Sequence, residues 1–62
     1  MSIAETIDIE TIADIERILP REFDTTEPGV VEAITAVVKA AEGGQREIYS
    51  DFLGVWVKLA GA

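Results

Sequence analysis

DFLGVWVKLAGA, residues 51–62, is the most hydrophobic stretch of this 62-residue chain, and Lys58 is the only charge among residues 52–62. Phe52, Val55 and Leu59 continue a spacing of four, three and four residues that begins at Ile48. That spacing is typical of one face of an α-helix. The stretch therefore predicts the second half of an amphipathic helix spanning about residues 45–60.

The same stretch also has two features that oppose a helix. The run VWV, residues 55–57, has β propensity, and Gly54 costs about 1 kcal/mol inside a helix. The polar residues Glu47, Asp51 and Lys58 nevertheless share the side opposite the apolar stripe. We take the helical period as the stronger signal and expect this helix to close the core.

A second helix is expected over about residues 27–42, because its apolar residues show the same period. Thr25 or Thr26 is suited to the N-cap, and Pro28 is suited to the first turn. Gly43 is the expected left-handed residue after the last turn. The apolar stripe consists of Val30, Ile34, Val37 and Ala41.

A third helix is expected over about residues 8–19, with Thr6 or Asp8 as its N-cap. Pro20 predicts its end near Leu19, because the residue before a proline disfavours the helical conformation. Residues 1–7 would form a short separate and loosely ordered segment, and Phe23 would enter the core from the following loop. The stripe of this helix consists of Ile12, Ile15 and Leu19.

These elements predict an all-α fold, a small three-helix bundle formed by one domain over residues 1–62. Because the connecting loops are short, consecutive helices should be antiparallel, and helices 27–42 and 45–60 should form an αα-hairpin. A chain of this length is marginally stable alone. Without Cys or His, it has neither a disulfide nor a zinc site to stabilise it, which leaves association with another chain.

The charge distribution excludes several classes of partner. The net charge is −7, and residues 1–32 carry all of it, with nine acidic residues against Arg17 and Arg21. Direct nucleic-acid binding requires clustered Lys and Arg, so it is not expected. No hydrophobic run reaches the roughly 18 residues of a transmembrane helix, and no signal peptide is visible. The sequence predicts a soluble, cytoplasmic protein.

The sequence favours a non-enzymatic interaction or assembly module over an enzyme. It has no catalytic triad, no imidazole and no phosphate-binding loop, and no cofactor is expected. The expected contact surface is the second apolar flank of helix 45–60, used for self-association into a homo-oligomer or for docking on a larger complex. Trp56 would either pack in the core between helices 27–42 and 45–60 or anchor this surface, because Trp is enriched at interface hot spots. The predicted apolar binding residues are Tyr49, Leu53, Trp56 and Val57.

An alternative role is that of a small acidic inhibitor or regulator, comparable in size and charge with phage-encoded or antitoxin-like proteins. Its carboxylates would occupy a basic groove on a partner, and its binding would be sensitive to salt. The carboxylate pairs Glu10/Asp14 and Glu47/Asp51 have helical spacing, but we interpret them as solvated faces and predict no metal site. The predicted acidic binding residues are Glu5, Asp8, Glu10 and Asp14.

Overall fold

The segment expected to be the C-terminal helix forms two β-strands instead. In the computed structural model, which describes residues 5–60, Glu47–Ser50 is strand β2 and Val55–Leu59 is strand β3. Gly54, in the turn between them, has a φ of 70°, a left-handed conformation that glycine adopts without steric cost. The predicted helix 45–60, the αα-hairpin built on it and the all-α bundle are therefore wrong.

Alternation with a period of two replaces the helical period in this segment. Ile48, Val55 and Leu59 are buried, as the helical stripe required, but Phe52 is 60% exposed. Val57 is fully buried, whereas its neighbour Trp56 is 41% exposed. A helix would have placed these two neighbours on one flank, while a strand points them to opposite faces.

The sheet has three strands in the order β1-β3-β2. Strand β1, Glu5–Ile9, pairs in parallel with β3, and β2 pairs with β3 in antiparallel fashion. The N–H of Ala60 donates to the carbonyl of Ile9 at 2.8 Å, and the N–H of Leu59 donates to the carbonyl of Arg46 at 2.8 Å. The hydrophobic stretch that opened the sequence analysis thus supplies the central strand. Of the expected separate segment 1–7, residues 5–7 belong to β1, and residues 1–4 lie outside the described residues.

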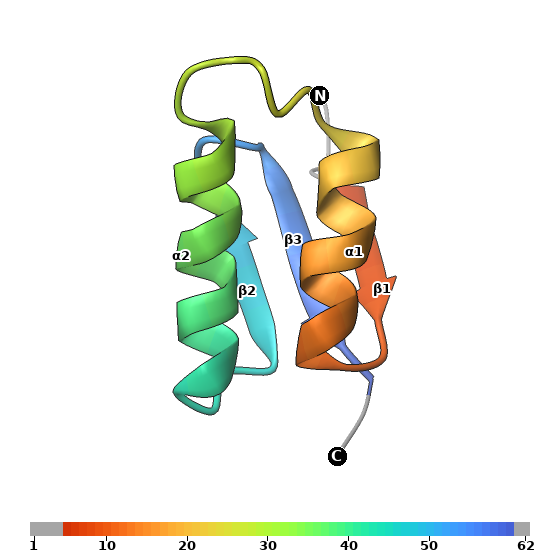
Figure 1. Cartoon of the computed structure of the whole chain (residues 1–62). Helices are drawn as coiled ribbons and strands as arrows, with labels where there is room; N and C mark the ends of the chain where they lie inside the picture. The colour runs from red at the N-terminus through yellow and green to blue at the C-terminus, as the bar shows by residue number, and fades with distance from the viewer. Residues whose placement is uncertain (1–4, 61–62) are drawn as a thin grey trace.

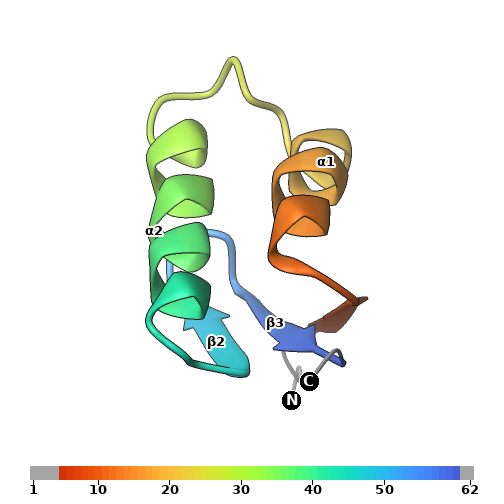
Figure 2. The ribbon, with the colours of Figure 1, turned by 60° about the horizontal axis from the view of Figure 1, so that its bottom comes forward.

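Two helices cover one face of the sheet, as Figures 1 and 2 show. Helix α1, Ile12–Glu22, and helix α2, Val30–Glu42, run antiparallel and pack against each other. The αα-hairpin of this protein is therefore formed by the helices that were predicted over residues 8–19 and 27–42, and the architecture is a two-layer α/β fold. Among residues 5–60, no helix lies on the opposite face of the sheet.

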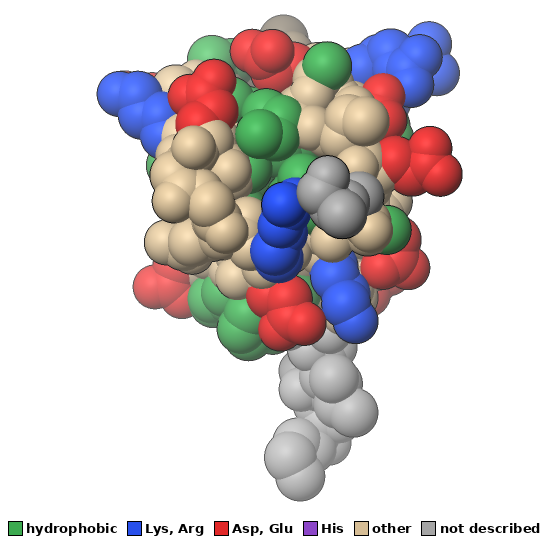
Figure 3. Space-filling model, turned by 90° about the horizontal axis from the view of Figure 1, so that it is seen from below, with side chains coloured by type: hydrophobic (Ala, Val, Ile, Leu, Met, Phe, Trp, Pro, Cys, Tyr) green, Lys and Arg blue, Asp and Glu red, His purple; other side chains and the backbone are tan. Residues whose placement is uncertain are grey.

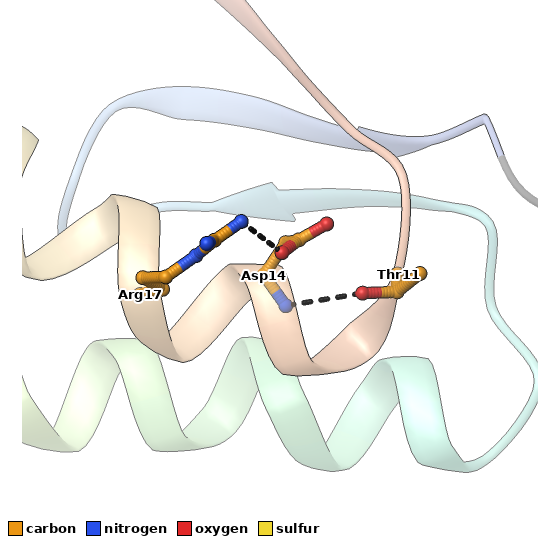
Figure 4. Close-up of polar contacts among 3 residues, drawn as sticks. All are labelled: Thr11, Asp14 and Arg17. Atoms are coloured by element: carbon orange, nitrogen blue, oxygen red, sulfur yellow. Dashed lines mark hydrogen bonds and ion pairs between the residues drawn. The ribbon is translucent and has the colours of Figure 1, made fainter.

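Helix α1 begins four residues later than the predicted position 8. Its N-cap is Thr11, whose hydroxyl oxygen accepts from the N–H of Asp14 at 3.3 Å (Figure 4). Asp14 also forms an ion pair with Arg17 at 2.6 Å. The helix continues through Pro20 to Glu22, although proline was expected to stop it. Pro20 lies in the last turn, and the N–H of Phe23 still bonds to the carbonyl of Leu19 at 3.1 Å.

Helix α2 begins three residues after its predicted start because the preceding polar residues form a turn. Oδ1 of Asp24 accepts from the hydroxyl and the N–H of Thr26, at 2.6 and 3.0 Å. These two hydrogen bonds, the hydroxyl first, lower the pKa of Asp24 below its ordinary value of 3.8. Thr26 is therefore not a cap, and Gly29, with a φ of 91°, occupies the N-cap.

The C-terminus of α2 is a Schellman motif, shifted by one residue from the prediction. The left-handed residue is Gly44, with a φ of 105°, whereas Gly43 remains right-handed. The N–H of Gln45 donates to the carbonyl of Ala40 at 3.1 Å, and the N–H of Gly44 donates to Ala41 at 3.0 Å. This pairing satisfies two terminal carbonyls and turns the chain into β2.

The core lies between the sheet and the two helices. The predicted stripe of α2 is confirmed, because all four of its residues are buried, and Phe23 packs against the core from the loop. Strand residues on the helix side of the sheet complete the cluster, so the core joins segments from both ends of the described chain. The buried residues are Ile9, Ile15, Leu19, Val30, Ile34, Val37, Ala41, Ile48, Val55, Val57 and Leu59.

Candidate functional site

The candidate site is the face of the sheet that the helices leave uncovered, which we call the open face. Strand alternation decides its members: residues at odd positions of β3 enter the core, and those at even positions point the other way. The register aligns these outward residues in two rows across the three strands. One row is Thr6, Trp56 and Tyr49, and the other is Asp8, Lys58 and Glu47.

An aromatic pair forms the apolar part of the open face. Tyr49 and Trp56 are directly opposed on β2 and β3, with ring centroids 5.3 Å apart and an interplanar angle of 52°. Such a tilted contact is favourable for two aromatic rings. Both side chains remain exposed, Tyr49 at 45% and Trp56 at 41%. The pair is thus fixed in position by the strands and still presents apolar surface to solvent.

A row of alternating charge lies beside the aromatic pair. Lys58 on the central strand is flanked in register by Asp8 on β1 and Glu47 on β2. Nζ of Lys58 is 3.9 Å from Oε2 of Glu47, and both side chains are more than half exposed. A hollow of about 240 Å³ lies against these residues and is lined by Thr6, Glu47, Trp56 and Lys58. The open face therefore combines an apolar centre with a polar margin.

The structure brings together two of the four predicted apolar binding residues. Tyr49 and Trp56 meet on the open face, whereas Val57 is fully buried on the helix side. Leu53 lies in the turn before β3 and packs partly against the core. The split follows from the strand period, since the expected helical flank does not exist.

The four predicted acidic binding residues do not form one surface. Glu5 and Asp8 lie on opposite faces of β1, and Glu10 lies in the connection that follows the strand. Asp14 is on α1, where it is already paired with Arg17. In the view from below in Figure 3, acidic and basic side chains are interspersed rather than gathered into one patch.

The carboxylate pairs with helical spacing are also separated. Glu10 precedes the first residue of α1, and Glu47 is in β2 while Asp51 is in the turn, so neither pair shares a helix face. Over residues 5–60, no group of three or more acidic residues is placed to hold a metal ion.

Three open-face residues were not among the predicted apolar or acidic site residues: Thr6, Glu47 and Lys58. The signal that could have found Lys58 is the strict alternation in VWVKL, residues 55–59, where hydrophobic residues at odd positions frame Trp56 and Lys58. Thr6 has no such local signal, because it joins the site only through the parallel pairing of β1 with β3.

Neither helix of the described region has the length and apolar character needed to cross a membrane. Comparisons of this chain with protein-family models, with curated proteins and with solved structures found no match.

Proposed function

We propose that this chain is a non-enzymatic protein–protein interaction module that docks through the open face of its sheet. The observation that carries the proposal is the exposed aromatic pair, Tyr49 and Trp56, on the sheet face that no helix of residues 5–60 covers. The contact surface expected on a C-terminal helix is here proposed for the sheet, with Tyr49 and Trp56 kept from the four expected contact residues.

Aromatic residues favour this role for energetic reasons. Tyr and Trp dominate interface hot spots, since each buries a large area while losing few side-chain rotamers. Here the cross-strand contact restrains both rings before any partner arrives. A second layer packed on the open face would also add to the limited core of a chain this small.

The charged row would provide register and selectivity at such an interface. Lys58 lies between two carboxylates, so a partner that matches the face must present charges in the complementary order. Exposed charge pairs of this kind contribute little affinity but penalise misaligned or like-charged partners. Both a second copy of the chain and a larger complex remain partners within this proposal.

Self-association is tested by sedimentation over a range of concentrations, with Trp56 fluorescence measured on dilution. We expect association that is lost in a Tyr49→Thr/Trp56→Thr double variant. Val31→Thr is the matched control, because it removes an exposed hydrophobic residue, 53% accessible, from α2. Association that survives the double variant would place the contact elsewhere and contradict the proposal.

Docking on a different protein is tested by a photoreactive phenylalanine analogue placed at Tyr49 or, as a control, at Val31 in living cells. We expect a discrete crosslinked product from position 49 and none from position 31. A wild-type chain that remains monomeric, combined with no difference between the two crosslinking positions, would remove the proposal.

The acidic inhibitor is the second candidate, favoured by the net charge of −7 concentrated in residues 1–32. Its binding would weaken steeply between low and high salt, because exposed charges are screened beyond about 10 Å at 0.1 M salt. Binding through the aromatic pair would persist at high salt and depend on Trp56. Measuring one complex at two salt concentrations, with and without Trp56→Thr, distinguishes the two roles.

A further inference from the structure

The outer edge of β2 is an unpaired sheet edge among the described residues. Bonded and non-bonded pairs alternate along an antiparallel ladder, and the bond between Leu59 and Arg46 makes that pair a bonded one. The Glu47–Lys58 and Tyr49–Trp56 pairs are therefore non-bonded. It follows that the backbone N–H and C=O groups of Glu47 and Tyr49 point away from β3, toward the edge.

An apolar groove lies between this edge and α2. Its volume is about 390 Å³, within the range of roughly 300–1,000 Å³ typical of ligand pockets. On the α2 side, alanines line the groove and leave room above the strand edge. Phe52, 60% exposed, lines it from the turn after β2. The main lining residues are Ala33, Ala36, Ala40, Ile48, Tyr49 and Phe52.

The charged side chain that lines the groove is acidic: it is Asp51, in the turn after β2. Glu47 lies on the same edge, with its carboxylate on the open face, 3.9 Å from Nζ of Lys58. Natural sheet edges are often protected by an inward Lys, a proline or a bulge. Residues 47–50, with the sequence EIYS, contain neither Lys nor Pro.

We propose that the β2 edge binds an extended, basic segment of another protein, which adds to the sheet as a fourth strand. Its backbone pairs with the outward groups of Glu47 and Tyr49. Alternate apolar side chains enter the groove beneath α2, and Lys or Arg residues lie near Glu47 and Asp51. Strand addition of this kind takes affinity from main-chain hydrogen bonds and selectivity from pockets for alternate side chains.

Charge favours a basic segment over a second copy of the chain. Each copy carries a net charge of −7, so pairing two β2 edges brings two strongly acidic molecules together. A basic partner removes that repulsion. This site goes beyond the proposed function, because Trp56 on the central strand does not line the groove.

The test uses three synthetic peptides of about eight residues, the length of an ordinary strand. The first alternates Val and Lys, the second is its copy with N-methyl groups on one backbone edge, and the third replaces Lys with Glu. With the first peptide, we expect NMR shifts at the amides of Glu47, Tyr49 and Ala36, and slower hydrogen exchange at Glu47 and Tyr49. The N-methylated and acidic peptides should each bind at least about tenfold more weakly than the first peptide.

Two variants of Glu47 separate the contribution of its backbone N–H to peptide affinity from the contribution of its charge. Glu47→Pro removes an outward N–H at the first position of an edge strand, where proline is tolerated. Glu47→Gln removes the same charge and keeps the N–H. We expect Glu47→Pro to lower affinity about tenfold relative to Glu47→Gln. Ala36→Gln, which fills the groove from an exposed helix position, should also abolish binding, whereas Ala13→Gln on α1 should not.

The proposal is overturned if the Val/Lys peptide at about 1 mM leaves the β2 and α2 amides unchanged. It is equally overturned if the N-methylated peptide binds as well as its parent. Because the exchange measurement uses the wild-type chain, it holds even where a variant does not fold. Trp56→Thr should leave peptide binding unchanged, so failure at this edge and failure at the open face are distinguishable.

Discussion

Tyr49 and Trp56 face each other across β2 and β3 as a non-bonded pair, with ring centroids 5.3 Å apart. Non-bonded positions of an antiparallel ladder bring side chains closest together. The two rings therefore stabilise the hairpin and remain exposed on the open face. This one relationship connects the strand register to the proposed function.

The first prediction compares neighbours in β3. Trp56→Thr should lower the free energy of unfolding by about 1 kcal/mol, the value of a cross-strand aromatic contact. Val57→Thr places a hydroxyl at a position with no exposed surface and should cost about 1–3 kcal/mol. Urea unfolding measures both losses of unfolding free energy. The two variants are comparable because each introduces the same β-branched residue, Thr. Equal losses would contradict the alternation on which the open face depends.

The second prediction concerns the start of α1. Thr11→Ala removes the hydroxyl that accepts from the N–H of Asp14 and should cost about 1 kcal/mol. Arg17→Ala removes an ion pair whose arginine side chain is 71% exposed and should cost less than about 0.5 kcal/mol. Thermal or urea unfolding gives both values. A larger effect at Arg17 than at Thr11 would show that the ion pair, and not the cap, fixes the helix start.

The third prediction concerns the contact between Gly29 and Phe52. A Cβ at Gly29 would lie 2.8 Å from the Phe52 ring, and the φ of 91° is itself unfavourable for alanine. Gly54→Ala meets no neighbouring atom and is penalised by its φ of 70° alone. Gly29→Ala should therefore cost more than Gly54→Ala, each on the order of 1–3 kcal/mol.

Phe52→Ala is the control for this contact. In a double-mutant cycle, it should recover part of the cost of Gly29→Ala and none of the cost of Gly54→Ala. Additive losses at residues 29 and 52 would show that the ring moves away freely.

The fourth prediction is a pH dependence at Asp24. The pKa of this carboxyl is lowered by hydrogen bonds from Thr26, so its ionised form is favoured in the folded state. The stabilisation is present above the unfolded pKa and is lost as the pH falls from about 4 through the folded pKa. A carbon-13 titration of the Asp24 carboxyl should give a midpoint below 3.8.

Asp24→Asn is the matched variant, because its side-chain oxygen still accepts hydrogen bonds but does not ionise. Its stability should fall less steeply than that of the wild type below pH 4. A wild-type midpoint at or above 3.8, or identical acid profiles for the two chains, would show that the Asp24–Thr26 turn is not formed in solution.

The sequence by itself determined α2, its four core residues and most of α1. These elements are decided locally, because residues three and four apart lie on the same face of a helix. It also placed Tyr49 and Trp56 among four predicted contact residues, although on a helix flank that does not exist. Both side chains are exposed on the open face, and their binding role stays a prediction. The sequence gives the number of acidic residues directly, but it does not show that the fold distributes them over separate surfaces.

Only the tertiary structure decided the conformation of residues 45–60. Ile48, Val55 and Leu59 fit a helical stripe and a strand alternation equally well, so local periodicity could not choose between them. The choice depends on pairing with β1: Ile9 is aligned with Leu59, fifty residues away in sequence, and both enter the core. No local pattern records such a partner. The central strand, the open face and the free β2 edge all follow from this pairing.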